Sequence, residues 1–293
     1  MTTPSTQPIR NIVVTGVSSG IGKDICRILI EKGYRVFGSV RKAADAQPLV
    51  DAFLDMFEPM IFDVCDRTAI ETEGKRVSAI VGSDGITGLV NNAGLAVFGP
   101  IELLDDAAFD HIMNVNVTGT RSVTNAFLPT LRLGRDHFGK AHIINVSSLS
   151  GIFNTPMNGG YCISKHAMES LGEIYRRELL PENIDVVSIR SGPIATEIWR
   201  KNIEETIPFS DTHYKNMAIK SHKIMKYAKK SALPPSVIAE LVLGILEGRK
   251  NRLSYHCGQG RNIARVFASS LMPKRLADRL IVNALNKPPK EPS

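Results

Sequence analysis

IRNIVVTGVSSGIGKDICRILIEKG, residues 9–33, runs from a short β-branched segment through a glycine-rich loop into a helical pattern. The helical pattern repeats apolar residues at Ile25, Ile28 and Leu29 and stops at Gly33, as an amphipathic helix does. A strand, a tight loop and a helix in immediate succession are typical of the first unit of an open α/β sheet. This stretch therefore predicts a strand at the start of an α/β pattern.

The glycine loop in this stretch has the spacing G-x-x-x-G-x-G and not the commoner G-x-G-x-x-G. Gly16 permits a tight turn, and Gly20 and Gly22 let the backbone approach a pyrophosphate at the positive end of the helix. Tight turns also use glycine for steric reasons alone. The strand before the loop and the helix after it favour a dinucleotide site over a plain turn.

Strand and helix patterns continue to alternate along the chain. We expect strands at 9–15, 34–40, 59–63, 86–91, 141–147, 184–190 and 252–256, and helices at 43–56, 66–80, 105–133, 160–180 and 235–247. Such alternation implies right-handed crossovers and a parallel sheet covered on both faces. The predicted fold class is α/β, a Rossmann-type doubly wound parallel sheet, in a single domain over residues 1–293 with a substrate-capping insert at 193–232 and a C-terminal helical extension at 261–293.

The composition of the 293 residues limits the function classes. No apolar run approaches the roughly 20 residues of a spanning helix, and the start MTTPSTQPIR is unlike a signal peptide, so we expect a cytoplasmic protein. Four widely spaced cysteines without a C-x-x-C pair predict reduced thiols and no metal site. The net charge is +7, but the sequence does not interleave basic and aromatic residues as a nucleic-acid-binding module does. An anionic ligand or a membrane surface accounts for the charge better.

A second stretch, SLSGIFNTPMNGGYCISK over residues 148–165, carries candidate proton-transfer chemistry. Tyr161 and Lys165 stand four residues apart in a helical pattern, so both side chains project from one face. A nearby positive charge favours the phenolate form of a tyrosine. Ser148 follows a buried strand pattern and therefore lies at the carboxyl edge of the sheet, where ligands bind. Taken alone, the Tyr-x-x-x-Lys pair could equally be a solvated helix face.

Six motifs in order resemble the short-chain dehydrogenase/reductase family, over about residues 9–256. They are Thr15-Gly-Val-Ser-Ser-Gly-Ile-Gly22, Asn91-Asn-Ala-Gly94, Asn116, Ser148, Tyr161-Cys-Ile-Ser-Lys165 and Ser191-Gly-Pro-Ile-Ala-Thr196. The resemblance implies an NAD(P)-dependent alcohol dehydrogenase or carbonyl reductase. The alternative hypothesis is a dinucleotide-binding sensor or scaffold without turnover. Loss of the catalytic tyrosine, lysine or serine would favour that alternative, and all three residues are present.

The resemblance also implies a role for each motif residue. Tyr161 is the general acid or base, and Lys165 holds the nicotinamide ribose and lowers the pKa of the tyrosine. Ser148 hydrogen-bonds the substrate oxygen, and Asn116 supports a proton relay. The implied cofactor-binding residues are Gly16, Ser18, Ser19, Gly20, Ile21, Gly22, Arg41, Asp63, Val64, Asn92, Ala93, Gly94, Tyr161, Lys165, Gly192, Ile194 and Thr196.

Several of these positions have a structural alternative. Asn91 and Asn92 could be turn residues, and Asn116 could face solvent on a helix. Asp63, by resemblance an adenine contact, could instead cap the helix from residue 66 onward. The chain departs from the family where Ser191 precedes Gly192, since proline then glycine is common there. We expect the turn to survive, because the glycine keeps its freedom.

The end of the second strand predicts the choice of nicotinamide cofactor. NAD-preferring relatives have an acidic residue where this chain has Val40, and Arg41 and Lys42 follow it. A guanidinium, with the hydroxyls of Ser18 and Ser19 in the facing loop, suits a 2′-phosphate. We therefore expect NADP(H) to be preferred over NAD(H). The alternative is that Arg41 and Lys42 are solvated charges that begin a helix.

The substrate and the partners are less closely specified. The chain is similar to the hydroxysteroid and retinol dehydrogenase branch, which implies a bulky apolar alcohol or ketone, and the insert is rich in apolar side chains that could instead close the core. The family resemblance implies a homodimer or homotetramer through the helices at 105–133 and 160–180. The basic, amphipathic stretch 274–285 predicts a helix that packs on the body or a partner subunit, with weak membrane-surface contact as the lesser alternative.

Overall fold

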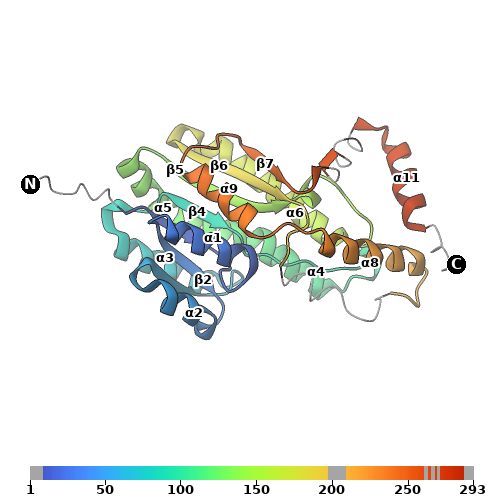
Figure 1. The fold of residues 1–293 in the computed structure, drawn as a ribbon, viewed down its shortest axis with the longest axis horizontal. Coiled ribbons are helices and arrows are strands. Elements are labelled where there is room, and N and C mark those ends of the chain that lie inside the picture. Colours follow the sequence, from blue (N-terminus) through green and yellow to red (C-terminus); the bar gives the residue numbers. More distant parts are fainter. Residues whose placement is uncertain (1–8, 197–208, 261–262, 265–267, 269–270, 287–293) are drawn as a thin grey trace, which may run out of the picture.

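The computed structural model describes residues 9–196, 209–260, 263–264, 268 and 271–286. The strands are β1 (Asn11–Val14), β2 (Arg35–Val40), β3 (Phe57–Ile61), β4 (Gly88–Asn91), β5 (Ala141–Ser148), β6 (Ile184–Ser191) and β7 (Ser254–Cys257). The helices are α1 (Gly20–Glu31), α2 (Ala43–Phe53), α3 (Arg67–Val81), α4 (Asp106–Met113), α5 (Thr120–Phe138), α6 (Gly159–Leu179), α8 (Lys215–Lys230), α9 (Ser236–Leu246) and α11 (Lys274–Asn286). Figure 1 shows helices on both sides of the sheet, with α8 and α11 at the end opposite the N-terminus.

The strands form one parallel sheet in the order β3-β2-β1-β4-β5-β6-β7. The strand order reverses between β1 and β4, and open α/β sheets bind ligands outside the carboxyl ends of their strands at such a switch point. β5 and β6 pair from Ala141↔Ile184 to Ser148↔Ser191, so Ser148 ends its strand at this edge. The predicted doubly wound parallel sheet is confirmed.

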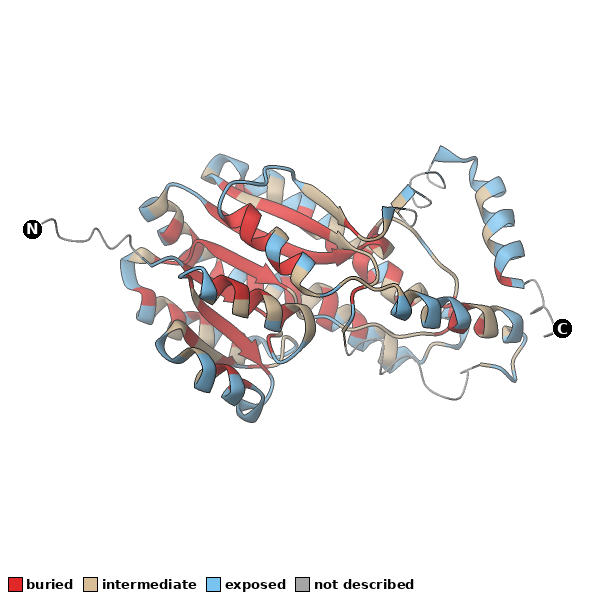
Figure 2. Cartoon of the chain, in the orientation of Figure 1, coloured by how far each residue is buried: buried red, intermediate tan, exposed pale blue. Residues whose placement is uncertain are grey.

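Two apolar clusters cover the two faces of the sheet, because successive side chains of a strand point to opposite sides. Ile12 and Val14 of β1 join the cluster that α1 and α9 complete. Val13, between them, joins the cluster that α3 and α5 complete. Figure 2 shows the buried residues concentrated in the sheet and on the helix faces turned toward it.

Several predicted elements differ from the observed ones in their bounds, and two of the differences have a clear physical reason. The third strand begins at Phe57 and not at Pro59, because β3 is an edge strand and an edge strand tolerates a proline inside it. The helix predicted at 105–133 is interrupted by a π-helical segment, Asn114–Gly119, and then continues as α5 to Phe138. Among the described helices, none combines the length and apolar character that crossing a bilayer requires.

Candidate active site

Three of the predicted catalytic side chains meet at the carboxyl edge of β5. Ser148 ends that strand, and α6 carries Tyr161 and Lys165 one turn apart. The Ser148 hydroxyl lies close enough to the Tyr161 phenol to lower its pKa, and its Oγ donates a hydrogen bond to the Ser191 carbonyl oxygen at 3.4 Å. Lys165 Nζ lies 5.8 Å from the centroid of the Tyr161 ring. The site therefore holds a phenol, a hydroxyl and an ammonium in direct proximity.

The pKa values in this cluster differ from the sequence-based expectation. Burial raises the pKa of Tyr161, and the neighbouring Ser148 hydroxyl offsets only part of that increase. Lys165 is 5% exposed and donates from Nζ to the carbonyl oxygen of Val146 at 3.0 Å. Burial lowers its own pKa to about 8. Burial therefore outweighs every effect that would lower the Tyr161 pKa, which lies above and not below its ordinary value, and at neutral pH Tyr161 is a protonated phenol beside a cation.

Asn116, the fourth predicted catalytic residue, is fully buried in the π-helical segment. Its Nδ2 donates to the carbonyl oxygen of Leu95 and to Ser164 Oγ, both at 2.9 Å, and its Oδ1 accepts from the Leu95 amide at 3.0 Å. Ser164 Oγ in turn donates to the Tyr161 carbonyl at 2.8 Å. The solvent-facing alternative for Asn116 is therefore wrong. Sequence reasoning assigned no role to Ser164, although it lies inside the Tyr161–Lys165 motif.

The glycine loop before α1 has the geometry of a phosphate cradle. Gly16 has a φ of +73°, and a Cβ on Gly22 would come within 2.2 Å of the Gly16 carbonyl oxygen, so a side chain cannot fit. Asn92 Nδ2 fastens the loop by donating to the carbonyl oxygens of Thr15 at 2.9 Å and Gly16 at 3.1 Å. Ile21 packs against the core from the first turn of α1. The loop thus leaves backbone at the start of a helix accessible to a pyrophosphate.

The loop after β4 connects the cradle to the catalytic cluster. A Cβ on Gly16 would lie 3.1 Å from Ala93 Cα, so this loop packs directly on the glycine turn. A Cβ on Gly94 would lie 3.2 Å from Asn116 Oδ1 and 3.7 Å from Lys165 Nζ. The glycine turn at Gly16 and the catalytic candidates Asn116 and Lys165 are therefore connected through the loop after β4. A nicotinamide dinucleotide fits this arrangement of glycine backbone and polar side chains.

The segment after β6 closes over the cradle. The Gly192 amide donates to the Cys257 carbonyl at 2.6 Å, and Ile194 is buried. A Cβ on Gly20 would lie 3.1 Å from Thr196 Cγ2. The turn therefore forms although this chain has Ser191 where the family commonly has proline. Thr196 contacts the glycine loop, as the sequence motif implies.

The family model described as short chain dehydrogenase matches residues 10–206. The chain belongs to the short-chain dehydrogenase family. This short-chain dehydrogenase is 34% identical to an NADPH-dependent 3-dehydrocapnine reductase of Ornithobacterium rhinotracheale, covering 95% of this chain and 98% of that protein. It is 29% identical to retinol dehydrogenase 7 of Mus musculus, with coverage of 94% and 89%.

A solved short chain dehydrogenase from Burkholderia cenocepacia in complex with NADP is 27% identical, with a TM-score of 0.69 and coverage of 96% of this chain and 98% of that one. Together with the family match, these relatives identify the chain as an NAD(P)-dependent oxidoreductase.

The end of β2 lies against the cradle of this short-chain dehydrogenase. The carbonyl oxygen of Ser39 accepts a hydrogen bond from the Gly16 amide at 3.1 Å. Arg41, two residues later, is exposed, and the structure shows it in no ion pair with any residue it describes. Ser18 and Ser19 in the facing loop are also exposed. These three side chains are therefore accessible at the glycine loop and at the end of β2.

The predicted adenine contact has a local structural role that differs from the helix-cap alternative. Asp63 Oδ1 accepts a hydrogen bond from the Cys65 amide at 2.9 Å, whereas Asp66 caps α3. The helix-cap alternative for Asp63 is therefore wrong. Beside it, the carbonyl oxygen of Val64 lies 2.8 Å from the place of a Cβ on Gly119, so this loop packs on the π-helical segment. The adenine contact stays a prediction.

Three other polar residues near the site have packing roles. Asn91 Nδ2 donates to Thr124 Oγ1 at 3.0 Å and to Asn145 Oδ1 at 2.9 Å inside the core, so Asn91 is not a turn residue. The His166 ring contacts the Cys162 carbonyl at 2.9 Å, which agrees with a structural role for both.

The structure describes only part of the segment 193–232, which the sequence predicts to be a capping insert. Its predicted apolar residues Ile198, Trp199, Ile203 and Ile207 lie outside the described residues. On α8, His222 is buried, and neither ring nitrogen has a hydrogen-bond partner among the described residues. Burial lowers the pKa of His222 and keeps its ring neutral. No sequence signal distinguished this histidine.

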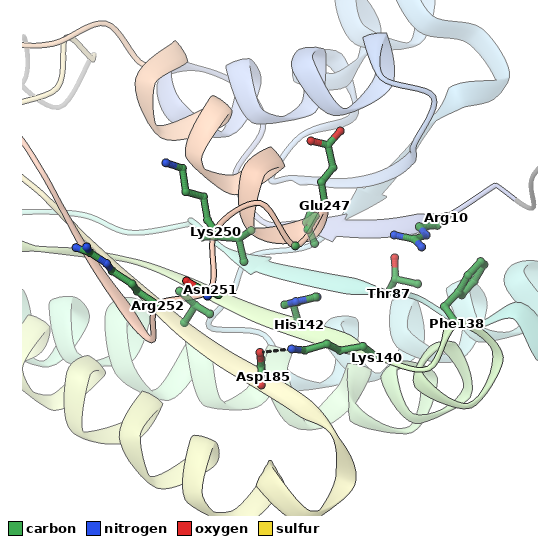
Figure 3. Close-up of a pocket in the computed structure, with 14 residues that line it drawn as sticks. Arg10, Thr87, Phe138, Lys140, His142, Asp185, Glu247, Lys250, Asn251 and Arg252 are labelled. Carbon is green, nitrogen blue, oxygen red and sulfur yellow. Dashed lines mark ion pairs between the residues drawn. The ribbon is translucent and has the colours of Figure 1, made fainter.

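A cavity of ≈ 300 Å³ lies at the opposite, amino-terminal edge of the sheet (Figure 3). Arg10 precedes β1 and Lys140 precedes β5, so this cavity is remote from Ser148. Lys140 Nζ pairs with Asp185 at 2.7 Å. His142 is buried beside them, and burial lowers its pKa to about 4. The residues that line the cavity carry a net positive charge, and the predicted chemistry lies at the other edge of the sheet.

Proposed function

We propose that this short-chain dehydrogenase uses NADPH to reduce a ketone on a bulky apolar substrate that is steroid-, retinoid- or lipid-like. The observation that carries the proposal is the contact of Ser148 with Tyr161, with Lys165 over the same ring. A protonated phenol is a proton donor, so the raised pKa of Tyr161 favours reduction at neutral pH and alcohol oxidation at alkaline pH.

The proposed proton chemistry uses the side chains of the cluster. NADPH, when bound, supplies the hydride to the carbonyl carbon. Ser148 and Tyr161 hydroxyls donate hydrogen bonds to the carbonyl oxygen, and Tyr161 then transfers its proton to it. The Lys165 ammonium stabilises the phenolate that remains. Asn116 positions the Tyr161 helix through Ser164 and supports the path by which the proton is replaced.

NADP(H) preference is supported by the charge around the end of β2. Arg41 is exposed beside the cradle, and Val40 stands where an acidic residue would bind a bare ribose hydroxyl. A charge-assisted hydrogen bond to a phosphate contributes ~1.5–3 kcal/mol, enough for a preference of about tenfold or more. One relative is named as NADPH-dependent, and one solved relative contains NADP.

An apolar substrate is supported by a groove next to the catalytic cluster. The groove of ≈ 290 Å³ lies between the loop that joins Ser148 to Tyr161 and the C-terminal helix α11, and it is lined by Asn154, Thr155, Pro156, Asp278, Ile281 and Val282. A long substrate held at Ser148 could extend its apolar end along this wall. The relative from Mus musculus is named a retinol dehydrogenase.

Self-association is supported by the outer face of α6. Ile163 and Ile174 are exposed there three turns apart, on the helix that the family resemblance implies as an interface. We propose a homodimer or homotetramer through α5 and α6. Light scattering of wild type and Ile174→Glu tests this: the substitution should lower the mass, and an unchanged mass would contradict the proposed interface.

A substrate panel tests the proposed reaction. Retinal, steroid ketones and long-chain ketones are compared with short and sugar-like carbonyls, each with NADPH and with NADH, by following oxidation of the reduced nicotinamide. We expect the highest kcat/KM for the apolar compounds with NADPH. Preference for the polar set would contradict the apolar substrate. NADPH binding without turnover of any compound would instead support the non-catalytic sensor or scaffold.

A further inference from the structure

Helices α8 and α11 contact each other beyond the carboxyl edge of the sheet (Figure 1). α11 also lines the groove with residues 154–156, which follow Ser148 in the chain. α11 therefore borders the groove proposed for an apolar substrate, and α8 packs against α11. Their outer surface, here called the α8–α11 surface, is defined by the exposed residues of Lys215–Lys230 and Lys274–Asn286.

The α8–α11 surface is strongly basic. α8 contains six lysines and no carboxylate, and α11 adds three basic residues and a single aspartate. Lys223 and Lys226 are exposed, and neither is ion-paired with any residue in the described part of the chain. This charge is therefore available to an anionic partner.

The same surface exposes large apolar side chains. Leu276 and Leu280, one turn apart on α11, are 48% and 51% exposed, and Ile224 on α8 is 51% exposed. A separate stripe of α11 turns inward and buries Leu285. α11 is thus apolar on two sides, and packing on the body accounts for only one of them.

We propose that the α8–α11 surface docks on an anionic lipid bilayer. Leucine side chains enter the boundary between headgroups and acyl chains, while lysines and arginines remain at the level of the anionic headgroups. A second copy of this chain fits less well, because it would bring two basic surfaces together. A nucleic acid would match the lysines and leave the leucines without an apolar partner. Docking does not depend on the proposed substrate, although it would place the groove beside a source of apolar ligands.

Co-sedimentation of the full chain with vesicles tests the proposal. We expect sedimentation with vesicles that contain phosphatidylglycerol, much weaker sedimentation with phosphatidylcholine alone, and partial release by salt. The double variant Leu276→Ser with Leu280→Ser should lower the partition coefficient for anionic vesicles by at least about tenfold. Lys223→Glu with Lys226→Glu should remove the preference for anionic vesicles.

The matched control carries Lys75→Glu and Ile80→Ser on α3, where both side chains are exposed at a distance from the α8–α11 surface. It should sediment like wild type. The proposal is overturned if wild type ignores anionic vesicles, or if the control loses as much binding as the leucine variant. It is also overturned if the leucine variant keeps its vesicle binding and changes its mass in light scattering, because the surface would then be an interface between copies. If the leucine variant fails to fold, the lysine variant and the salt dependence test the proposal. A lysine variant that keeps the preference for anionic vesicles, or binding that salt does not weaken, would then overturn it.

Discussion

The ammonium of Lys165 lies 5.8 Å from the centroid of the Tyr161 ring, with both side chains on one face of α6. Lys165 is buried there and is held by a hydrogen bond to the Val146 carbonyl. A buried cation opposes folding, since burial lowers its pKa from 10.5 to about 8. The chain therefore retains a destabilising charge at the place where a phenolate would form, as expected of a functional site.

Replacing this lysine with a neutral side chain should stabilise the fold and abolish turnover. The unfolded state keeps the Lys165 proton up to pH 10.5 and the folded state only to about 8, so the penalty is fully present at pH 7. We expect Lys165→Met to raise the free energy of unfolding by about 1–3 kcal/mol, measured by urea denaturation. The exposed control Lys75→Met should change it by less than about 0.5 kcal/mol. A less stable Lys165→Met protein would contradict this account.

The same pKa predicts a pH limit on ketone reduction. Above about pH 8 Lys165 loses the charge that stabilises the phenolate, whereas the pKa of Tyr161 is raised and Tyr161 remains a proton donor. We expect kcat/KM to fall as pH rises through about 8, because kcat/KM reports the ionisation of the free enzyme. A profile that stays flat well above pH 8 at saturating NADPH would show that the charge of Lys165 is not required.

Cofactor choice should follow the end of β2. Val40→Asp with Arg41→Ala places a carboxylate where a 2′-phosphate is expected and removes the guanidinium. We expect the ratio of kcat/KM for NADPH over NADH to fall from at least about ten to below one. The control Lys75→Ala, on the outside of α3, should keep the native ratio. Equal use of both cofactors by the native protein, or an unchanged ratio in the double variant, would mean that β2 does not set the choice.

Stability should fall in mild acid because of His142. Its pKa is 6.5 ordinarily and about 4 when buried, so the unfolded state binds a proton first as pH falls. The neutral, buried His142 ring therefore costs nothing above pH 6.5. As the pH falls from 6.5 to about 4, the free energy of unfolding decreases by at most about 3 kcal/mol. His142→Leu should flatten this part of the curve of unfolding free energy against pH, and the exposed control His111→Gln should not. Parallel curves for wild type and His142→Leu would refute this assignment.

The fold could be predicted from the sequence because its signals are local. Each buried strand is a short apolar run, and the glycines at 16, 20 and 22 occupy positions where a side chain is sterically excluded or disfavoured. The π-helical segment around Asn116 could not be predicted, because one residue inserted in a helix leaves no distinct apolar period.

The sequence predicted that Ser148, Tyr161 and Lys165 lie close together, and it did not predict the pKa values of Tyr161 and Lys165. Tyr161 and Lys165 follow from their spacing, but the direction of a pKa shift depends on burial and on where the ammonium points, which only the structure gives. The groove between α11 and residues 154–156 had no sequence signal, because it depends on contacts between distant segments. The same holds for His222, whose ring nitrogens have no hydrogen-bond partner among the described residues.

The most direct test of the central claim compares Tyr161→Phe with Tyr175→Phe. Both tyrosines lie on α6, and Tyr175 donates a hydrogen bond to Asn125 away from Ser148. NADPH binding is followed by fluorescence, and turnover is measured with the best ketone of the panel. We expect Tyr161→Phe to bind NADPH with a kcat that is lower by a factor of about 10²–10⁴. Tyr175→Phe should keep both NADPH binding and the native kcat. Full turnover by Tyr161→Phe would show that this phenol is not the proton donor and would contradict the account.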